Sequence, residues 1–364
     1  MRVPYIVSLT AVVAITLWLG DASLANPTSG AEGSGARDEP GLSELVDRLK
    51  QQGAFDAGAE SDAQEMPFKF TATQPYENVP SIVKCTRFED DCNNELSVLR
   101  SIHHGGNDRK GKRRNKVPSS EIQSLFPSYP KTAVGKGYYC LIFNAYSEVT
   151  LKDYANKLDV GQRDKLLPGI FVQLITALKY MHSLGYVHGD ITPWNIMIDT
   201  SSHNAPKVIL TNFVGSHYVG DKASSTIEAT FGYRSPEEYL KDRIDQYKRD
   251  SWMLGATLYT ALTGKRAYGR AMRPNENPID FIDEMNNLMK NVGLCKFHSR
   301  EPVTTSKNEH LLELMDTLME CDPEKRPIVS KLDPSLLYKL AREKRVRTFL
   351  DQTWAKITST DVKA

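Results

Sequence analysis

The chain contains no glycine between Gly58 and Gly105, although glycine occurs 23 times in its 364 residues. Backbone amides approach a phosphate closely only where no Cβ intervenes, so a glycine-rich phosphate-binding loop is excluded from this stretch. Charge of one sign is also scarce, because 46 basic residues stand against 45 acidic ones, a net charge of +1. The chain as a whole therefore has no bias toward polyanions.

Cysteine is sparse, and its spacing matches no metal-binding motif. The five cysteines are Cys85, Cys92, Cys140, Cys295 and Cys321. An odd number leaves at least one thiol unpaired within the chain even if disulfides form. Cys85 with Cys92 and Cys295 with Cys321 are the candidate disulfides, and five buried thiols are the alternative that we favour.

The N-terminus has the order of a secretory signal peptide. Arg2 precedes an apolar stretch at residues 5–19, and small residues follow up to Ala25. We predict a signal peptide at residues 1–25. An uncleaved membrane anchor is the alternative, which the short length of the apolar stretch disfavours.

Residues 26–65 read as a low-complexity linker, rich in Gly, Ala, Ser and acidic residues, that buries too little apolar surface to fold alone. Residues 41–53 differ, because apolar side chains recur there on one helical face before Gly53. These side chains are Leu42, Leu45, Val46 and Leu49. We predict a short amphipathic helix that packs on the rest of the chain, with partner binding as the alternative.

Two strings carry the strongest functional signal. His188-Gly189-Asp190-Ile191-Thr192-Pro193-Trp194-Asn195 resembles the catalytic loop of a protein kinase, and Asn212-Phe213-Val214 stands where that family has its D-F-G triplet. The other kinase landmarks follow in the family's order: Lys84 of the V-A-I-K strand, Glu95 of the αC helix, Glu237 of A-P-E, Asp250 of the next helix, and Arg326, the partner of Glu237. The ordered set covers residues 66–340.

This resemblance implies an α+β, two-lobed protein kinase-like fold without a Gly-rich loop. We expect a small β-rich N-lobe with the αC helix at residues 66–146, a larger helical C-lobe at 147–356 and a tail at 357–364. Residues 171–182 and 311–319 have the apolar periodicity of C-lobe helices.

The resemblance also assigns positions to the candidate site. Asp190 occupies the place of the catalytic base, while Lys84, Glu95, Asn195 and Asn212 occupy the places that bind the nucleotide and its metal ions. The alternative readings are structural: Asp190 anchors its loop, and Lys84 with Glu95 forms an ion pair that fixes αC. We favour these structural roles.

Departures from the kinase pattern predict impaired catalysis. Asn212 offers a neutral oxygen where hard cations prefer a carboxylate. Gly189 replaces the arginine that usually reads a phosphorylated activation loop, and Thr192 replaces a lysine that many Ser/Thr kinases place against the γ-phosphate. We therefore predict a pseudokinase with weak or absent ATP and magnesium binding, no resident cofactor and no metal site.

A kinase domain without a Gly-rich loop behind a signal peptide is similar to the With-No-Gly-loop kinases, which Toxoplasma and related coccidian parasites secrete. Within that family the chain looks most like a pseudokinase of the cyst wall. The resemblance implies secretion to dense granules, the parasitophorous vacuole and the cyst wall, and a binding or scaffold role. A divergent active Ser/Thr kinase and a structural component of the wall or matrix are the alternatives.

Six basic residues cluster within eight positions, between αC and the next expected strand. They are Arg109, Lys110, Lys112, Arg113, Arg114 and Lys116. We predict an exposed segment that contacts an anionic membrane or an acidic protein, with a solvated insertion as the alternative. Nucleic acid is not expected, because no aromatic residues interleave these charges. The sequence does not identify the protein partner.

Overall fold

The computed structural model describes residues 40–51, 69–73, 75–105, 119–201, 206–219, 229–240, 244–270, 272–296 and 300–341. The chain divides into two compact units. The smaller comprises Met1–Glu89 with Lys131–Ile142, and the larger comprises Asp90–Pro130 with Phe143–Ala364. The predicted signal peptide, the basic segment at 109–116 and the predicted tail lie outside the described residues.

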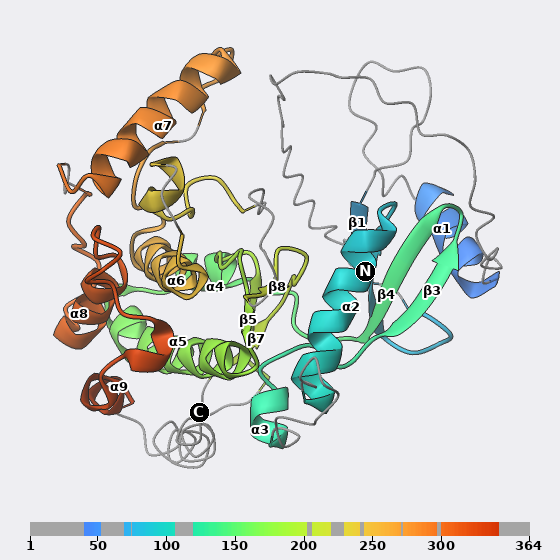
Figure 1. Ribbon diagram of the computed structural model, residues 1–364. Coiled ribbons are helices and arrows are strands. Elements are labelled where there is room, and N and C mark those ends of the chain that lie inside the picture. Colours follow the sequence, from blue (N-terminus) through green and yellow to red (C-terminus); the bar gives the residue numbers. More distant parts are fainter. Residues whose placement is uncertain are drawn as a thin grey trace. The chain divides into compact units, whose positions relative to one another are not determined.

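The smaller unit contains a four-stranded sheet (Figure 1). Its strands are β1 (Lys69–Thr73), β2 (Ser81–Thr86), β3 (Lys131–Gly135) and β4 (Tyr138–Asn144). Their order in the sheet is β1-β2-β4-β3, and β1 pairs antiparallel with β2, as β3 does with β4. Strand β4 is buried along most of its length.

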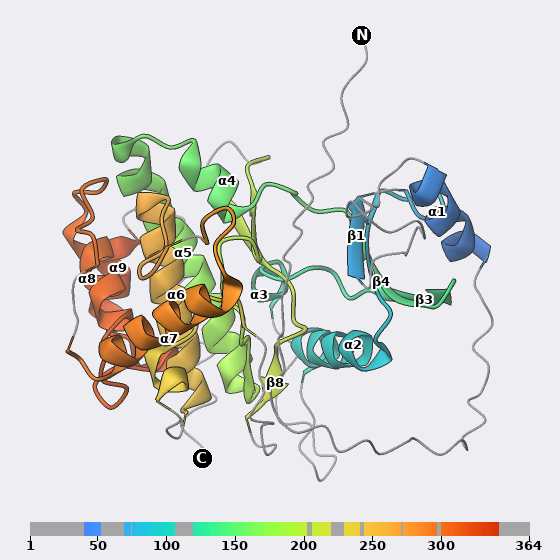
Figure 2. The same ribbon diagram turned by 90° about the horizontal axis from the view of Figure 1, so that it is seen from above.

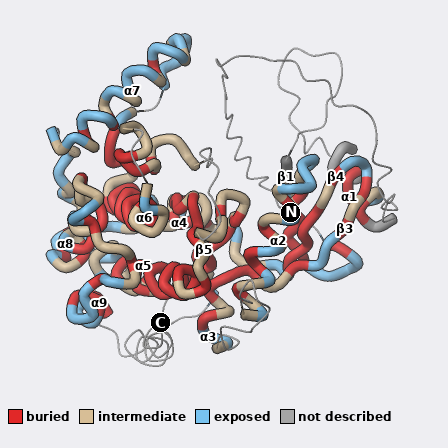
Figure 3. The backbone as a smooth tube through the Cα atoms, in the orientation of Figure 1, coloured by how far each residue is buried: buried red, intermediate tan, exposed pale blue. Residues whose placement is uncertain are grey.

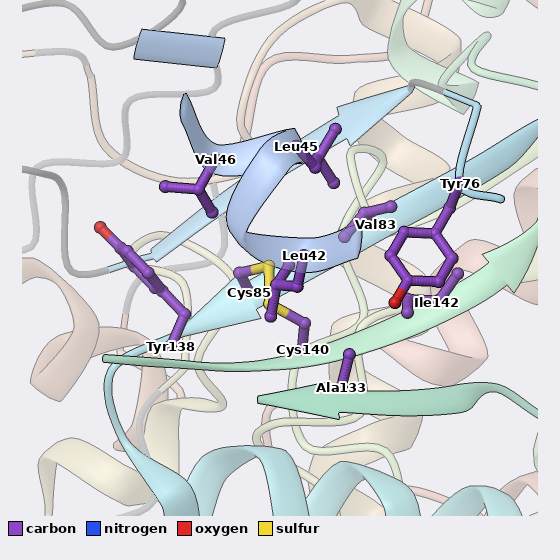
Figure 4. Close-up of a cluster of buried hydrophobic side chains, with 10 residues drawn as sticks. All are labelled: Leu42, Leu45, Val46, Tyr76, Val83, Cys85, Ala133, Tyr138, Cys140 and Ile142. Atoms are coloured by element: carbon purple, nitrogen blue, oxygen red, sulfur yellow. A yellow bond between two sulfur atoms is a disulfide. The ribbon is translucent and has the colours of Figure 1, made fainter. Parts of the chain in front are cut away.

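Helix α1 (Pro40–Gln51) packs on this sheet. Leu42, Leu45 and Val46 are fully buried in a cluster with side chains of β2, β3 and β4, as Figure 4 shows. Gly135 of β3 permits the close approach, since a Cβ there would lie 3.3 Å from Leu42 Cδ2. The predicted intramolecular packing of this amphipathic helix is therefore confirmed.

The cysteines pair differently from the expectation. Cys85 of β2 is bonded to Cys140 of β4, because these two strands are neighbours in the sheet, and Cys92 is a buried thiol. The other candidate disulfide, Cys295–Cys321, is present. The favoured reading of five thiols was wrong, as was the pairing of Cys85 with Cys92.

The larger unit is mainly helical (Figures 1 and 2). Its helices are α2 (Glu89–His104), α3 (Ser120–Gln123), α4 (Leu151–Asn156), α5 (Val160–Ser183), α6 (Gln246–Thr263), α7 (Pro278–Gly293), α8 (Glu309–Leu318) and α9 (Pro334–Leu340), with the short 3₁₀ turns Pro236–Tyr239 and Val329–Lys331. Two small antiparallel sheets join β5 (Tyr186–Val187) to β8 (His217–Tyr218) and β6 (Ile196–Asp199) to β7 (Lys207–Leu210).

Helices α5 and α6 form the centre of this unit, and Figure 3 shows both as largely buried. Asp159 starts α5 with a capping box that it shares with Gln162. Asp245 caps α6, which ends at Gly264 in the left-handed conformation. Helices α8 and α9 pack against these two (Figure 2). Among the described residues no helix has the length and apolar character that a membrane crossing requires.

The predicted pair of Glu237 with Arg326 is confirmed. Arg326 donates from Nη1 to Glu237 at 2.7 Å and from Nη2 at 3.1 Å, and both side chains are buried. The guanidinium also lies over the ring of Trp252, 4.9 Å from its centroid. The α+β class, with a small sheet-bearing unit and a larger helical one, is confirmed as well. Helix α2, which contains Glu95 and was expected as the αC helix of the N-lobe, groups with the larger unit instead.

Candidate functional site

The candidate site is built on the loop between β5 and β6. Asp190 is half-buried there, and its carboxylate accepts two hydrogen bonds. The Thr230 backbone N–H donates to one oxygen at 2.8 Å, and Asn195 Nδ2 donates to the other at 2.8 Å. Asp190 is thus held in one orientation by two donors from different segments of the larger unit.

Asn212 follows β7 and joins the same network. Its φ of +68° lies in the left-handed region, which asparagine tolerates better than most residues. Asn212 Nδ2 donates to Asn195 Oδ1 at 3.1 Å, while Asn195 Nδ2 donates to both the carbonyl and the carboxylate of Asp190 at 2.8 Å. The amide nitrogen of Asn195 therefore donates to two acceptors, and its amide oxygen accepts the hydrogen bond from Asn212.

These side chains fit a magnesium ion poorly. One carboxylate, from Asp190, stands beside two neutral amides, whereas hard cations prefer several anionic oxygens. The amide oxygen of Asn195 already accepts a hydrogen bond from Asn212. Asn195 and Asn212 are thus joined by a hydrogen bond between their two amides.

Glu95 connects α2 to the segment that follows Asn212. Its side chain is buried, and Oε1 accepts a hydrogen bond from the Phe213 backbone N–H at 3.1 Å. The neighbouring Asn94 donates from Nδ2 to the carbonyls of Val214 and Ser216, at 2.9 Å each. Three hydrogen bonds therefore fix this face of α2 to one short stretch of chain.

The structure brings together Asp190, Asn195 and Asn212 and places Glu95 next to them through Phe213. Lys84 lies in β2 of the smaller unit, half-buried and opposite Thr71 of β1. The resemblance to a protein kinase had implied a place in the site for each of these residues.

His188 is a core residue. Its Nε2 contacts the Thr211 carbonyl at 3.0 Å, and its Nδ1 lies 3.2 Å from the Asp190 backbone nitrogen, which donates to it. Complete burial lowers the pKa of His188 below its ordinary value, although nearby carboxylates, first that of Asp250, oppose the shift. A neutral imidazole with Nε2 protonated satisfies both contacts.

Asp250, at the start of α6, anchors the same loop. Its buried carboxylate accepts hydrogen bonds from the backbone nitrogens of His188 and Gly189 at 2.9 Å and lies 2.9 Å from His182 Nε2. Burial alone would raise the pKa of Asp250, but the hydrogen bond and charge of His182 and the contacts of the loop hold it below its ordinary value.

Sequence reasoning treated Asp250 only as a landmark and did not find Thr230 at all. An acidic residue inside an apolar helix was a usable signal for Asp250. Thr230 acts through its backbone N–H, which leaves no trace in residue type.

Gly189 has a conformational reason to be glycine. Its φ is +80°, and a Cβ there would lie 2.4 Å from the Gly215 carbonyl oxygen. The buried guanidinium of Arg249 lies close by, 3.4 Å from the same point through Nη1. A side chain at position 189 would therefore need the backbone around Gly215 to move.

Comparison with known proteins identifies the family. Residues 115–333, more than half of the chain, match the protein kinase domain, so the chain belongs to the protein kinase family. It is similar to sperm motility kinase 2B of Mus musculus (27% identity over 164 residues, 45% of this chain and 30% of that protein). It is also similar to serine/threonine-protein kinase nekl-2 of Caenorhabditis elegans (30% over 179 residues, 48% and 44%) and to serine/threonine-protein kinase Nek4 of Mus musculus (28% over 208 residues, 56% and 23%). The matches span less than half of each relative's length.

Proposed function

We propose that the protein is a catalytically impaired kinase-fold protein that works as a binding or scaffold module. The observation that carries this proposal is the 3.1 Å hydrogen bond from Asn212 to Asn195. It joins the two side chains at the family's metal positions to each other and leaves Asp190 as the only carboxylate among the three. Phosphoryl transfer depends on positioning and charge compensation by metal ions, so this donor set predicts very slow chemistry.

A divergent active kinase is the second candidate. Asp190 is kept, and Asn195 and Thr230 orient its carboxylate as a base would require. The relatives named above are called kinases, and this supports the alternative at the level of the family.

A thermal-shift measurement with ATP separates the two candidates. We expect no change in the melting temperature with ATP alone, with ATP and magnesium, or with ATP and manganese. A ligand at a hundred times its dissociation constant would stabilise the fold by about 2.7 kcal/mol, which is readily detected.

Phosphoryl transfer is measured in parallel on a generic protein substrate. The Asp190→Asn variant serves as the matched control, because any activity that it retains comes from a contaminant. A magnesium-dependent stabilisation, together with transfer that Asp190→Asn abolishes, would establish the active kinase instead.

We further propose a secretory route and kinship with the With-No-Gly-loop kinases, with dense granules, the parasitophorous vacuole and the cyst wall as destinations. The absence of glycine from residues 59–104 supports the kinship. Two disulfides support an oxidising compartment, since such bonds are rare in reducing ones. Detection of the chain in the secreted fraction, cleaved after Ala25, tests this route.

The basic segment at 109–116 remains a proposed contact with an anionic membrane or an acidic protein. Its six basic residues supply a strong local charge in a chain whose net charge is +1. Replacing all six with Ser is expected to weaken salt-sensitive binding to anionic liposomes. Unchanged binding at low salt would reduce the segment to a solvated insertion.

A further inference from the structure

Two cationic side chains, Lys152 and Arg266, lie at the turn that follows α6. Lys152 of α4 donates from Nζ to the Gly264 carbonyl at 2.6 Å, and Arg266 follows two residues later. Both side chains are half-buried. Burial lowers the pKa of Lys152, the nearby Asp153 opposes this shift, and the positive charge of Arg266 adds to it.

Neither cation is neutralised by an ion pair within the part of the chain that the structure describes. The carboxylate of Asp153 accepts a hydrogen bond from the Thr150 hydroxyl at 2.7 Å instead. In contrast, the other arginine of this turn, Arg270, is bound by Glu276 and Glu284. The pair Lys152–Arg266 is therefore a local excess of positive charge.

Two glycines shape the backbone next to these two cations. Gly264 ends α6 in the left-handed conformation, at φ +76°, and turns the chain so that its carbonyl meets Lys152. Gly232 lies under Arg266, where a Cβ would stand 3.0 Å from Arg266 Cδ and 3.4 Å from Nε. The arginine stem thus lies along backbone that carries no side chain.

The cations border the loop that carries Asp190. The Lys152 backbone N–H donates to the Pro193 carbonyl at 3.3 Å. Tyr233 follows Gly232, which lies under Arg266, and its ring stands edge-on to that of Trp194 with 5.9 Å between centroids. The half-buried Trp194, which follows Pro193, therefore adds an aromatic side chain to this part of the loop.

We propose that Lys152 and Arg266 bind an anionic side chain of a polypeptide partner, laid across the loop at Trp194. This inference rests on the proposed binding function and names the chemistry of its partner. Carboxylates and phosphate esters share that chemistry, since both accept charge-assisted hydrogen bonds from a guanidinium and an ammonium. An anion between the two cations would also relieve their mutual repulsion.

Fluorescence anisotropy with the full secreted chain tests the proposal. The probes are a short labelled peptide rich in Asp and Glu, the same peptide with phosphoserines in place of the acidic residues, and a version with Lys in their place. We expect both anionic peptides to bind in a salt-sensitive manner and the basic one not to bind. The stronger of the two anionic peptides identifies the source of the charge.

The variants Lys152→Gln and Arg266→Gln are each expected to weaken binding by about tenfold or more, the loss of one charge-assisted hydrogen bond. Lys165→Gln and Lys339→Gln are matched controls, because they remove the same charge from exposed positions on α5 and α9. A further variant carries Ser at all six basic positions of 109–116. It separates the contribution of this segment to binding from that of Lys152 and Arg266.

Three results would overturn the proposal: absence of binding by both anionic peptides, equal loss in the Lys165→Gln control, or loss only in the 109–116 variant. None of them would alter the ATP measurement, so failure of this site and failure of the impaired-kinase proposal are distinguishable. Binding that depends on Lys152 and Arg266 in an otherwise active kinase would refute only the latter.

Discussion

At position 212 an amide in place of a carboxylate reverses the direction of hydrogen bonding. A carboxylate only accepts, whereas Asn212 donates to Asn195 and so completes a chain of donors that ends at Asp190. The resemblance to a protein kinase implied that these three residues share a site, because they stand at matching positions of its motifs. It did not predict the closed network, because the orientation of an amide depends on neighbours that only the fold supplies.

Asn212→Asp is expected to restore little phosphoryl transfer. The change removes the donor to Asn195 and sets two acceptors against each other, so the free energy of unfolding should fall by about 1 kcal/mol without metal. Thr192 and the missing phosphate cover would remain, and catalytic groups that act as a unit contribute non-additively. Chemical denaturation and a transfer assay measure the two effects.

Asn212→Ala is the matched control, since it removes the same donor without adding charge. If the Asp variant transfers phosphate robustly and the Ala variant does not, the rest of the site is competent and the structural role assigned to Asp190 is wrong.

Gly189→Ala should destabilise the fold. The positive φ and the 2.4 Å contact of a Cβ with the Gly215 carbonyl oxygen both oppose a side chain. Backbone strain of this kind costs about 1–3 kcal/mol. Gly161→Ala, near the start of α5, is the control, because its Cβ would meet only Asp159 Oδ1 at 3.5 Å. Equal melting temperatures for the two variants would contradict this account of Gly189.

At the scale of elements, the sequence predicted structure that depends on neighbouring residues but not pairings between distant segments. The apolar spacing of Leu42, Leu45 and Val46 predicted α1, because helical periodicity is written into neighbouring residues. The bond of Cys85 to Cys140 depends on β2 lying beside β4, and sheet order is a property of the whole chain. No local residue pattern indicates that β2 and β4 are neighbours in the sheet.

Leu45→Ala is expected to lower the free energy of unfolding of the smaller unit by about 2–5 kcal/mol, the usual effect of truncating a buried leucine. Leu45 is fully buried in the cluster beneath α1 (Figure 4). Glu44→Ala, on the exposed side of the same helix, is the control. Similar denaturation midpoints for the two variants would show that α1 contributes little to the stability of the sheet.

At the scale of the whole molecule, charge is balanced overall and unevenly placed. The net charge is +1, yet Lys152 and Arg266 form a local excess without an ion-pair partner among the described residues, while histidines are buried in the core of the larger unit. His103, His188 and His217 share one direction, because burial lowers the pKa of each below its ordinary value. Because all three pKa values are lowered, the larger unit is expected to lose stability in acid.

Stability is therefore expected to fall as the pH drops below about 6.5, the ordinary pKa of histidine. Below that value the unfolded chain binds protons that the buried imidazoles of the native state do not, so the free energy of unfolding rises with pH in this window. His188 is completely buried and is expected to contribute up to about 1.4 kcal/mol per pH unit. Denaturation curves between neutral and mildly acidic pH measure the slope, and NMR of the His188 ring identifies the group. The assignment fails if that ring titrates in the native protein near 6.5, because its proton would then be bound equally in both states.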